Sequence, residues 1–325
     1  MKIALLGYYG FGNCGDEALR ESITAGIKGV LPQAQVKILR YDLRVLMDCD
    51  MLILGGGSLL QDKTSTRSFL YYAGMIRLAK LLRKKVYLMA QGIGPVTKWF
   101  NKLFLKRILR QVELITLRDL RSLYYLESIN IENPKLLETA DPTFLLEPEP
   151  QPNFSTRTLG VSIRGGCRED IIARALDEMV RRYKMQVLFI PFQLSRDLSA
   201  SRRISALMKE KSSIMERELT PRQMLGLIGK LDLLLGMRLH ALIFAVNQLV
   251  PAVGLSYDPK VEAFLYEVDL PYQRCPELQE EELVAQLNQI VENREGVRKI
   301  LEFYRRKLRA AAQLNFGLIN MLLRK

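Results

Sequence analysis

Histidine is almost absent from this chain of 325 residues, in which His240 is the only one. A metal centre built from several histidines is therefore excluded. Cysteine is scarce too, and Cys14, Cys49, Cys167 and Cys275 lie far apart without any C-x-x-C spacing. This distribution is expected of reduced thiols in a reducing compartment and argues against a disulfide scaffold. We expect neither a bound metal nor another cofactor.

A long uninterrupted apolar segment is also missing. The longest stretch without charged residues, Leu239 to Tyr257, is nearly long enough to span a bilayer. It contains His240, Asn247, Gln248 and Pro251, so we interpret it as buried core. The opening residues, MKIALLGYYGFGNCGDEALR, reach glycine and aspartate too early for a signal peptide. We therefore expect a cytoplasmic protein.

Acidic residues are outnumbered, with 35 Asp and Glu against 48 Lys and Arg and a net charge of +13. This balance favours anionic partners such as phosphate compounds, nucleic acid or a lipid surface. The hydrophobic share of 48% and the charged share of 26% are those of an ordinary globular protein, which excludes disordered and collagen-like chains. The length suggests two domains of about 150 residues each.

Strand-like apolar runs alternate with helical segments along the chain, a pattern that predicts parallel α/β sheets. The first helix is expected from Glu17, and Asp141-Pro142 is interpreted as a turn. Residues 147–157, EPEPQPNFSTR, have the proline-rich polar composition of a linker. The runs that we interpret as strands include Ile3–Leu6, Val36–Leu39, Met51–Leu54, Val86–Ala90, Leu114–Leu117, LGVSIR, VLFIPF, LDLLLG and VPAVGLS.

The predicted fold is therefore α/β, with two Rossmann-like, doubly wound domains over residues 1–146 and 158–300. Ligands of such sheets bind outside the carboxyl ends of the strands, so we expect a cleft between the two domains. The basic helical region at 301–325 is predicted to pack back on the first domain.

His240 and Arg238 follow directly on the predicted strand LDLLLG, at the start of the next helix. The free N–H groups of a helix N-terminus favour an anion there. Histidine is also the side chain best suited to proton transfer near neutral pH. A lone histidine among apolar residues is more often structural, but the strand-end position and the arginine argue for catalysis. Both roles stay open on the residues alone.

Two further basic residues follow strands of the second domain. Arg164 ends LGVSIR, from where a guanidinium can hold a carboxylate or phosphate with two hydrogen bonds. Lys260 opens the helix after VPAVGLS, although a cation at a helix start opposes the helix dipole. An anionic ligand would explain both residues, and the alternative for Arg164 is an ordinary solvated arginine.

Two glycine-rich turns join strand to helix in the first domain. The turn Gly12–Glu17 carries Asn13 and Asp16, whose side chains could bond hydroxyl or amide groups. The other turn, Gly55-Gly56-Gly57-Ser58, is followed one helical turn later by Gln61. Neither turn is a G-x-G-x-x-G or Walker loop. Each is either a ligand loop or simply a tight turn.

Basic charge is concentrated in residues 77–121, which hold twelve Lys and Arg against two acidic residues. Within them, KWFNKLFLKRILRQV interleaves apolar and basic residues. A basic amphipathic helix can lie on an anionic membrane surface. More often such a helix faces the core and has one solvated side. No recognised nucleic-acid reading module is present, so we expect no nucleic-acid partner.

Taken in order, segments along nearly the whole chain resemble the polysaccharide pyruvyl transferase family. The similarity is greatest to the CsaB type, which acts in bacterial cell-wall polymer synthesis. The segments that carry the resemblance are GYYGFGNCGDEAL, LILGGGSLLQD, AQGIGP, ADPTFLL, GVSIR, GMRLHALIFA and VGLSYDPKV.

The resemblance implies a fold like that of GT-B glycosyltransferases and a donor, phosphoenolpyruvate. The pyruvyl group would bridge two hydroxyls of a sugar as a ketal, with release of phosphate. For the CsaB type, the sugar is an N-acetylmannosamine unit on a lipid-linked precursor at the inner face of the membrane. The basic stretch 77–121 would then give peripheral contact with that membrane.

The resemblance also assigns residues. Arg238, Leu239 and His240 match the family's R-L-H motif, which holds the donor and supplies the proton-transferring histidine. Arg164 and Lys260 match the arginine and lysine of the donor side. The acceptor side falls to the first domain, where we place Asn13, Asp16, Gly56, Ser58 and Gln61. Whether His240 acts as acid to the donor or as base to the hydroxyl stays open.

Two other functions remain open on the sequence. One is a GT-B glycosyltransferase that uses a nucleotide sugar, although the second domain shows no obvious carboxylate placed to hold a ribose. The other is a non-catalytic protein that binds an anionic glycan or a membrane surface through residues 77–121.

Overall fold

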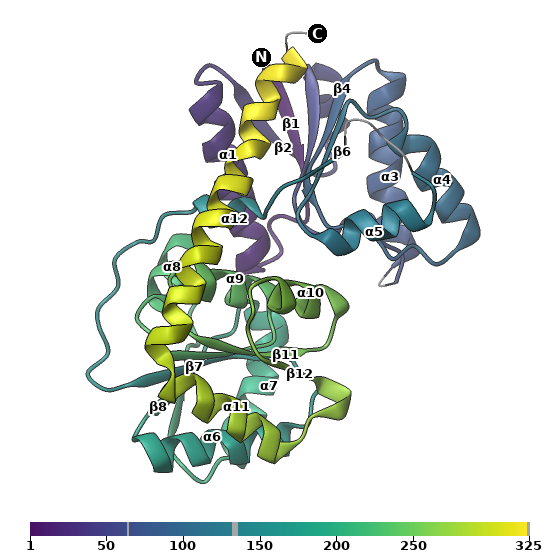
Figure 1. Cartoon of the computed structure of the whole chain (residues 1–325). Coiled ribbons are helices and arrows are strands. Elements are labelled where there is room, and N and C mark those ends of the chain that lie inside the picture. The colour runs from purple at the N-terminus through teal and green to yellow at the C-terminus, as the bar shows by residue number, and fades with distance from the viewer. Residues whose placement is uncertain (64, 132–135, 324–325) are drawn as a thin grey trace. The chain divides into compact units, whose positions relative to one another are not determined.

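The computed structural model describes residues 1–63, 65–131 and 136–323 (Figure 1). The chain divides into two compact units. Unit 1 comprises Met1–Phe11, Ala18–Leu145 and the C-terminal part of the chain from Leu308, and unit 2 comprises Gly12–Glu17 and Leu146–Lys307. The glycine-rich turn Gly12–Glu17 therefore belongs to unit 2, which the sequence did not indicate.

Unit 1 is built on a parallel six-stranded sheet in the order β2-β1-β3-β4-β5-β6. Every residue of the inner strand β3 is buried, as expected for a parallel sheet covered on both faces. The strands are β1 (Lys2–Leu6), β2 (Gln35–Leu39), β3 (Met51–Gly55), β4 (Lys85–Gln91), β5 (Leu114–Leu117) and β6 (Leu136–Glu138).

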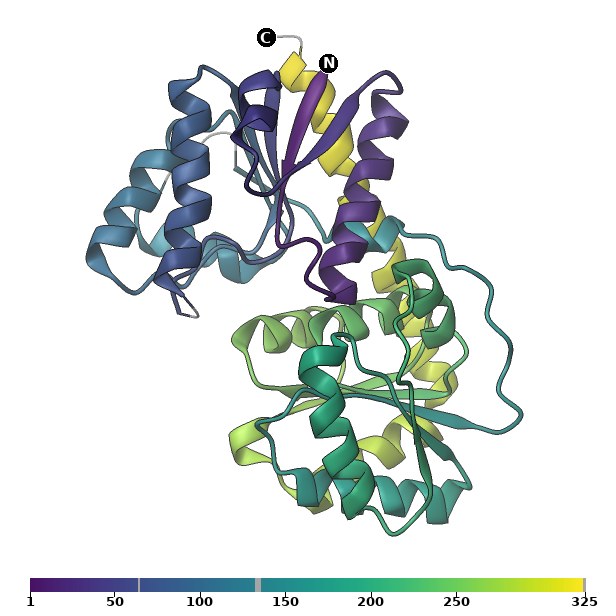
Figure 2. The same cartoon turned by 180° about the vertical axis from the view of Figure 1, so that it is seen from behind.

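Helices cover both faces of this sheet (Figures 1 and 2). One face packs against α1 (Cys14–Val30) and the end of α12 (Arg294–Leu323), whose Phe316 and Ile319 are buried beside residues of β1, β3 and β4. The other face packs against α2 (Leu43–Asp48), α3 (Thr66–Leu81), α4 (Trp99–Leu109) and α5 (Leu120–Ser128).

Unit 2 repeats this plan with the strand order β12-β11-β10-β7-β8-β9, again all parallel. Its strands are β7 (Thr158–Ser162), β8 (Gln186–Phe189), β9 (Ser212–Ile214), β10 (Leu233–Gly236), β11 (Ala252–Ser256) and β12 (Tyr272–Arg274). The helices α6 (Glu169–Tyr183), α7 (Leu194–Leu207) and α11 (Glu280–Glu292) lie on one face, and α8 (Pro221–Ile228), α9 (Leu239–Asn247) and α10 (Pro259–Glu267) on the other (Figure 1). The α/β fold class with two doubly wound units is confirmed.

Several predicted boundaries were wrong by a few residues, and two of these errors concern site residues. Helix α1 begins at Cys14, not at Glu17, because the Asn13 carbonyl accepts the first helical hydrogen bond from the Glu17 N–H (3.0 Å). Strand β7 ends at Ser162, so Arg164 lies in the following turn and not on the strand. Two short 3₁₀ helices, η1 (Pro142–Leu145) and η2 (Cys275–Glu277), also lie in the described ranges.

The apolar segment Leu239–Tyr257 forms α9, a turn and β11, and its helix is buried along nearly its whole length. None of the helices in the described ranges has the length and apolar character needed to cross a bilayer.

Candidate functional site

Arg238 is the N-cap residue of α9, directly after the carboxyl end of β10. Its side chain is buried, and its Nε donates to Oδ2 of Asp197 (3.1 Å) while its Nη2 donates to Oδ1 of the same carboxylate. Asp197 has no exposed surface and lies in the first turn of α7. The paired carboxylate therefore fixes the orientation of the guanidinium. A guanidinium has five N–H donors, so this pair leaves capacity for a further anion.

Asp197 organises more than the arginine. Its Oδ2 also accepts hydrogen bonds from the backbone N–H groups of Phe192 (3.1 Å) and Gln193 (3.0 Å). The carbonyl of Phe192 in turn accepts from the Cys14 N–H (2.8 Å) at the start of α1. One buried carboxylate thus connects the R-L-H segment to the turn after β8 and, through it, to the glycine-rich turn.

His240 lies in the first turn of α9, where its side chain is half-buried and its Nε2 is fully buried. The imidazole packs directly against the backbone of Gly15, in the first turn of α1. A Cβ atom on Gly15 would lie 2.2 Å from Nδ1 and 2.8 Å from Cβ of His240. Gly15 therefore provides space that any other residue would fill, and it sets the position of the imidazole.

Replacing Gly15 with alanine is expected to displace the His240 imidazole and to lower the catalytic rate by about 10²-fold, the scale of loss for a misplacement of about 1 Å. The new methyl group would meet the root of the histidine side chain and not only its flexible end, so the clash cannot be relieved by a rotamer change. The rate of phosphate release from phosphoenolpyruvate, the donor that the sequence resemblance implies, measures this effect.

Gly29 provides the matched control in the same helix, because a Cβ atom there would meet nothing within 4 Å. The Gly29→Ala variant should keep full activity, and its helix should be slightly more stable. Equal activity of the two variants would contradict the role assigned to Gly15.

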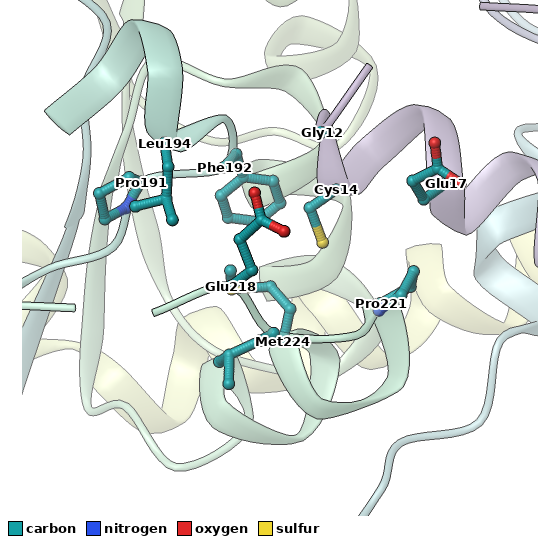
Figure 3. Close-up of a pocket in the computed structure, with 10 residues that line it drawn as sticks. Gly12, Cys14, Glu17, Pro191, Phe192, Leu194, Glu218, Pro221 and Met224 are labelled. Atoms are coloured by element: carbon teal, nitrogen blue, oxygen red, sulfur yellow. The ribbon is translucent and has the colours of Figure 1, made fainter. Parts of the chain in front are cut away.

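A small cavity of about 90 Å³ lies beside the start of α1 in unit 2 (Figure 3). The side chain of Cys14 points into it, towards Met224, and Glu218 extends from the opposite wall. The lining residues are Gly12, Cys14, Glu17, Pro191, Phe192, Leu194, Glu218, Leu219, Pro221 and Met224. None of these lining residues is basic, so the cavity is not suited to a phosphate-bearing donor.

Arg164 and Lys260 lie at the ends of the strands that flank β10. The Arg164 guanidinium stacks over the ring of Tyr257, with Cζ 4.9 Å from the ring centroid. Tyr257 directly follows β11, and Lys260 lies in the first turn of α10, where its N–H is bonded to Asp258 (3.1 Å). A stacked guanidinium keeps its edge available for an anion.

Asn13 and Asp16 interact with each other in the glycine-rich turn. The Asn13 amide donates to the Asp16 carboxylate, and its carbonyl oxygen accepts from the Gly15 N–H (3.2 Å). Both side chains are half-buried. These bonds fix the first turn of α1 and hold Gly15 in place against His240.

The remaining predicted residues lie in unit 1. Gly56 has a φ of +67° in the left-handed region, and Ser58 accepts a hydrogen bond from Nη2 of Arg118 (3.2 Å). Arg118 is itself buried and paired with the buried Asp141 (3.0 Å). Gln61 is half-buried in the same turn as Ser58. Asp141 is therefore more than the turn residue that we predicted, because it also neutralises Arg118.

Asp62, next to Gln61, stabilises the start of α4. Its carboxylate accepts hydrogen bonds from the Thr97 N–H (2.7 Å), the Lys98 N–H (3.1 Å) and the Asn101 amide (2.8 Å), which hold the start of α4. Burial opposes ionisation, but these hydrogen bonds outweigh it and hold the pKa of the Asp62 carboxyl below its ordinary value.

The Asp62→Asn variant is expected to lose about 1–3 kcal/mol of unfolding free energy at pH 7, because backbone donors lose a charged acceptor. A carboxyl with a depressed pKa contributes stability above its unfolded pKa and loses that contribution as the pH falls. The difference in unfolding free energy between Asp62→Asn and the parent should therefore shrink as the pH falls below about 3.9, the pKa of an unfolded Asp. Urea unfolding at pH 7 and at about pH 3 measures this difference. Asp48→Asn, which breaks an exposed ion pair with Lys2, is the control and should change stability much less.

The structure thus brings Arg164, Arg238, Leu239, His240, Lys260, Asn13 and Asp16 into unit 2, and Gly56, Ser58 and Gln61 into unit 1. Sequence reasoning missed Asp197, Gly15, Tyr257 and Arg118. Within the described ranges, no group of three or more His, Cys, Asp and Glu side chains is arranged to hold a metal ion.

Residues 13–259 match the family model of the polysaccharide pyruvyl transferases. This protein belongs to the polysaccharide pyruvyl transferase family. The matched range runs from Asn13 to the start of α10, so it contains the R-L-H segment and ends one residue before Lys260.

A relative of this family member is the amylovoran biosynthesis protein AmsJ of Erwinia amylovora. The two are 21% identical over 285 residues, which cover 78% of this chain and 68% of AmsJ.

Solved structures with the same fold include MnaA of S. aureus with UDP, with a TM-score of 0.72 and 9% identity over 99% of this chain and 97% of the other. Another is the UDP-GlcNAc 2-epimerase of Neisseria meningitidis with UDP-GlcNAc, with a TM-score of 0.67 and 11% identity over the full length of both chains. The GT-B-like fold of this chain is thereby established. At such low identity these structures carry no argument about its substrate.

Proposed function

We propose that this family member transfers the pyruvyl group of phosphoenolpyruvate to two hydroxyls of a sugar, with His240 as the proton-transferring residue. One observation carries the proposal. Three neighbouring parallel strands of unit 2, β7, β10 and β11, each lead at their carboxyl ends to a basic residue: Arg164, Arg238 and Lys260. The free N–H groups at the N-terminus of α9 follow directly on Arg238, which is the N-cap residue of this helix.

These groups match the charges of the donor. Phosphoenolpyruvate carries a carboxylate and a phosphate, and both are anions that arginine binds with paired hydrogen bonds. Arg238 is held in one orientation by Asp197, and Arg164 by its stacking on Tyr257. Two pre-oriented guanidinium groups lose little freedom when the donor binds, which favours affinity.

The chemistry moves one proton to the donor methylene and removes one from each of two hydroxyls, and the leaving phosphate takes up a proton. Protonation of the donor methylene leaves an oxocarbenium-like C2, to which the first sugar hydroxyl adds with loss of its proton. Phosphate then leaves from C2, and the second hydroxyl adds to the same carbon with loss of its proton. The products are the cyclic ketal and inorganic phosphate. His240, in the first turn of α9 beside Arg238, has the position and the proton chemistry for one of these transfers.

For the acceptor, we propose an N-acetylmannosamine unit of a lipid-linked cell-wall precursor, as the resemblance to the CsaB type implies. The similarity to a protein named for amylovoran biosynthesis supports a polysaccharide precursor as the acceptor class. Asn13, Asp16, Gly56, Ser58 and Gln61 are the residues that we propose for acceptor binding.

A lipid-linked acceptor requires contact with the membrane surface, and α4 exposes apolar and basic side chains that suit such a contact. It buries Leu105, Ile108 and Leu109, but Trp99 is 72% exposed and Leu103 is 58% exposed. The sequence favoured a core-facing helix with one solvated side, and α4 has this arrangement, but large apolar side chains lie on its solvated side. Basic residues lie among the exposed apolar ones, at positions 98, 102, 106 and 107. We propose that this side of α4 docks on anionic lipid.

Vesicle binding tests the docking. The protein should sediment with vesicles that contain phosphatidylglycerol but not with neutral ones, and Trp99→Ala together with Leu103→Ala should weaken binding at least about tenfold. If added salt abolishes vesicle binding but these two substitutions do not weaken it, Trp99 and Leu103 do not contribute to docking.

Phosphate release from phosphoenolpyruvate tests the function itself. It should depend on an added aryl-linked or lipid-linked N-acetylmannosaminyl disaccharide, and the product should gain the mass of a pyruvyl ketal. Folded protein that releases no phosphate with a range of acceptors, but consumes a nucleotide sugar, would replace the proposal with the glycosyltransferase alternative.

A further inference from the structure

The turn between β7 and α6, residues 163–168, crosses the carboxyl edge of the sheet in unit 2. In that sheet β7 is followed by β10, β11 and β12 in space. Yet Arg164 of the turn contacts Tyr257 at the end of β11, and Sγ of Cys167 lies 3.8 Å from the carbonyl oxygen of Cys275, just after β12. Since β10 lies between β7 and β11, the turn passes the carboxyl end of β10, the strand that leads to Arg238 and His240. We name residues 163–168 the strap.

The far end of the strap lies beside Cys275. Cys167 and Cys275 are both free, and Sγ of Cys167 is within hydrogen-bonding reach of the Cys275 carbonyl oxygen (3.8 Å), so the two thiols belong to adjoining backbone segments. Cys167 is half-buried and so within reach of small reagents, whereas Cys275 is 3% exposed. Two thiols on adjoining segments, one accessible and one protected, are the arrangement of a reactive cysteine with its resolving partner.

The environment makes the accessible thiol the more acidic one. The hydrogen bond from Cys275 lowers the pKa of Cys167, burial opposes this, and the Arg168 backbone N–H lowers it further. The same contact and burial raise the pKa of Cys275. Cys167 is therefore the group that reacts first, because the thiolate is the nucleophile.

The strap has room to move. Gly166 has a φ of +95°, and a Cβ atom there would meet nothing within 4 Å. Gly165 precedes it, so two residues without side chains separate Arg164 from Cys167. Such a segment can adjust until the sulfur atoms reach a bonding distance of about 2.05 Å.

We propose that Cys167 and Cys275 form a reversible disulfide that locks the strap across the sheet edge. With hydrogen peroxide as oxidant, the Cys167 thiolate attacks one oxygen, forms a sulfenic acid, and releases hydroxide, which takes up a proton to give water. The Cys275 thiol then attacks the sulfenyl sulfur, the S–S bond forms, and a second water leaves. Two thiols and one peroxide thus give one disulfide and two water molecules, and a dithiol reductant reverses the reaction.

The effect on the donor rests on the proposed function. Arg164 belongs to the strap, so fixing the strap moves or restrains a guanidinium that we assign to phosphoenolpyruvate. Oxidation should weaken phosphoenolpyruvate binding by about ten- to hundredfold, the loss expected when one hydrogen bond to a charged ligand is broken.

Peptide mapping of the full chain under non-reducing conditions tests the disulfide without any assay of activity. Protein treated with a small excess of hydrogen peroxide should yield one linked peptide, Cys167 to Cys275, which disappears with dithiothreitol. Cys167→Ser should abolish the link. Cys49→Ser is the matched control, because Cys49 is 2% exposed and burial raises its pKa, so the link should form as in the parent.

Calorimetric titration with phosphoenolpyruvate then tests the consequence. Weaker binding after oxidation, restored by dithiothreitol and absent in Cys167→Ser, supports the lock. Cys167 oxidised to sulfinic acid with no linked peptide overturns the proposal. If the linked peptide forms but the affinity for phosphoenolpyruvate is unchanged, the disulfide is confirmed and its effect on donor binding is refuted. If the reduced parent does not bind phosphoenolpyruvate, the proposed function is contradicted. The peptide map still tests whether the disulfide forms.

Discussion

Replacing His240 with alanine is expected to lower kcat for pyruvyl transfer by about 10²–10⁴-fold, the usual contribution of general acid–base catalysis. The residue lies in the first turn of α9, and Gly15 fixes its imidazole from the other side. The substitution removes the proton carrier but leaves Arg164 and Arg238, so the KM for phosphoenolpyruvate should change much less than kcat. Steady-state phosphate release with saturating acceptor measures both constants.

A second variant separates catalysis from a structural role. His240→Gln keeps a polar side chain of similar size but cannot transfer a proton in the same way, so it should be as inactive as His240→Ala. A folded His240→Ala protein with full activity would refute the assignment.

Local sequence signals were sufficient for the part of the site that lies at strand ends. Arg238 and His240 follow an apolar run that ends in Gly236-Met237, so their place at the start of a helix could be predicted. The order of strands and helices predicted the parallel sheets in the same way. These signals depend on residues close together in the chain.

The parts of the site that the sequence did not indicate depend on contacts between distant segments. Gly15 looked like a loop glycine, but it is a helical glycine that leaves room for an imidazole. Asp197 lies in an amphipathic helix, where an acidic residue usually faces solvent. Arg118 and Asp141 meet only because the carboxyl ends of parallel strands lie along one edge of the sheet.

Helical periodicity also left open which side of α4 would be buried. Its apolar residues occur on more than one side, and the pattern alone predicts a helix without choosing between them. Packing against the rest of unit 1 buries Leu105, Ile108 and Leu109, and leaves Trp99 and Leu103 exposed. An exposed tryptophan beside lysines is the observation that makes membrane docking testable.

The Asp197→Ala variant is expected to lose about 3–5 kcal/mol of unfolding free energy, because removing one partner of a buried ion pair leaves the other charge buried and uncompensated. Arg238 is 8% exposed and Asp197 has no exposed surface. The same change removes the acceptor of the Phe192 and Gln193 N–H groups. A urea unfolding curve measures the loss.

The matched control in unit 2 is Glu216→Ala, which breaks an exposed pair with Arg202 (3.0 Å) and should cost at most about 1 kcal/mol. Asp197 does not itself contact the donor in our proposal, so it is a positioning residue. Its loss should raise the KM for phosphoenolpyruvate through a reoriented Arg238 while kcat falls less, the reverse of the pattern for His240→Ala. The Asp197→Asn variant keeps the shape but not the charge, and should lie between the parent and Asp197→Ala in both measurements. An unfolding midpoint equal to that of Glu216→Ala, together with an unchanged KM, would show that Arg238 keeps its orientation without the carboxylate.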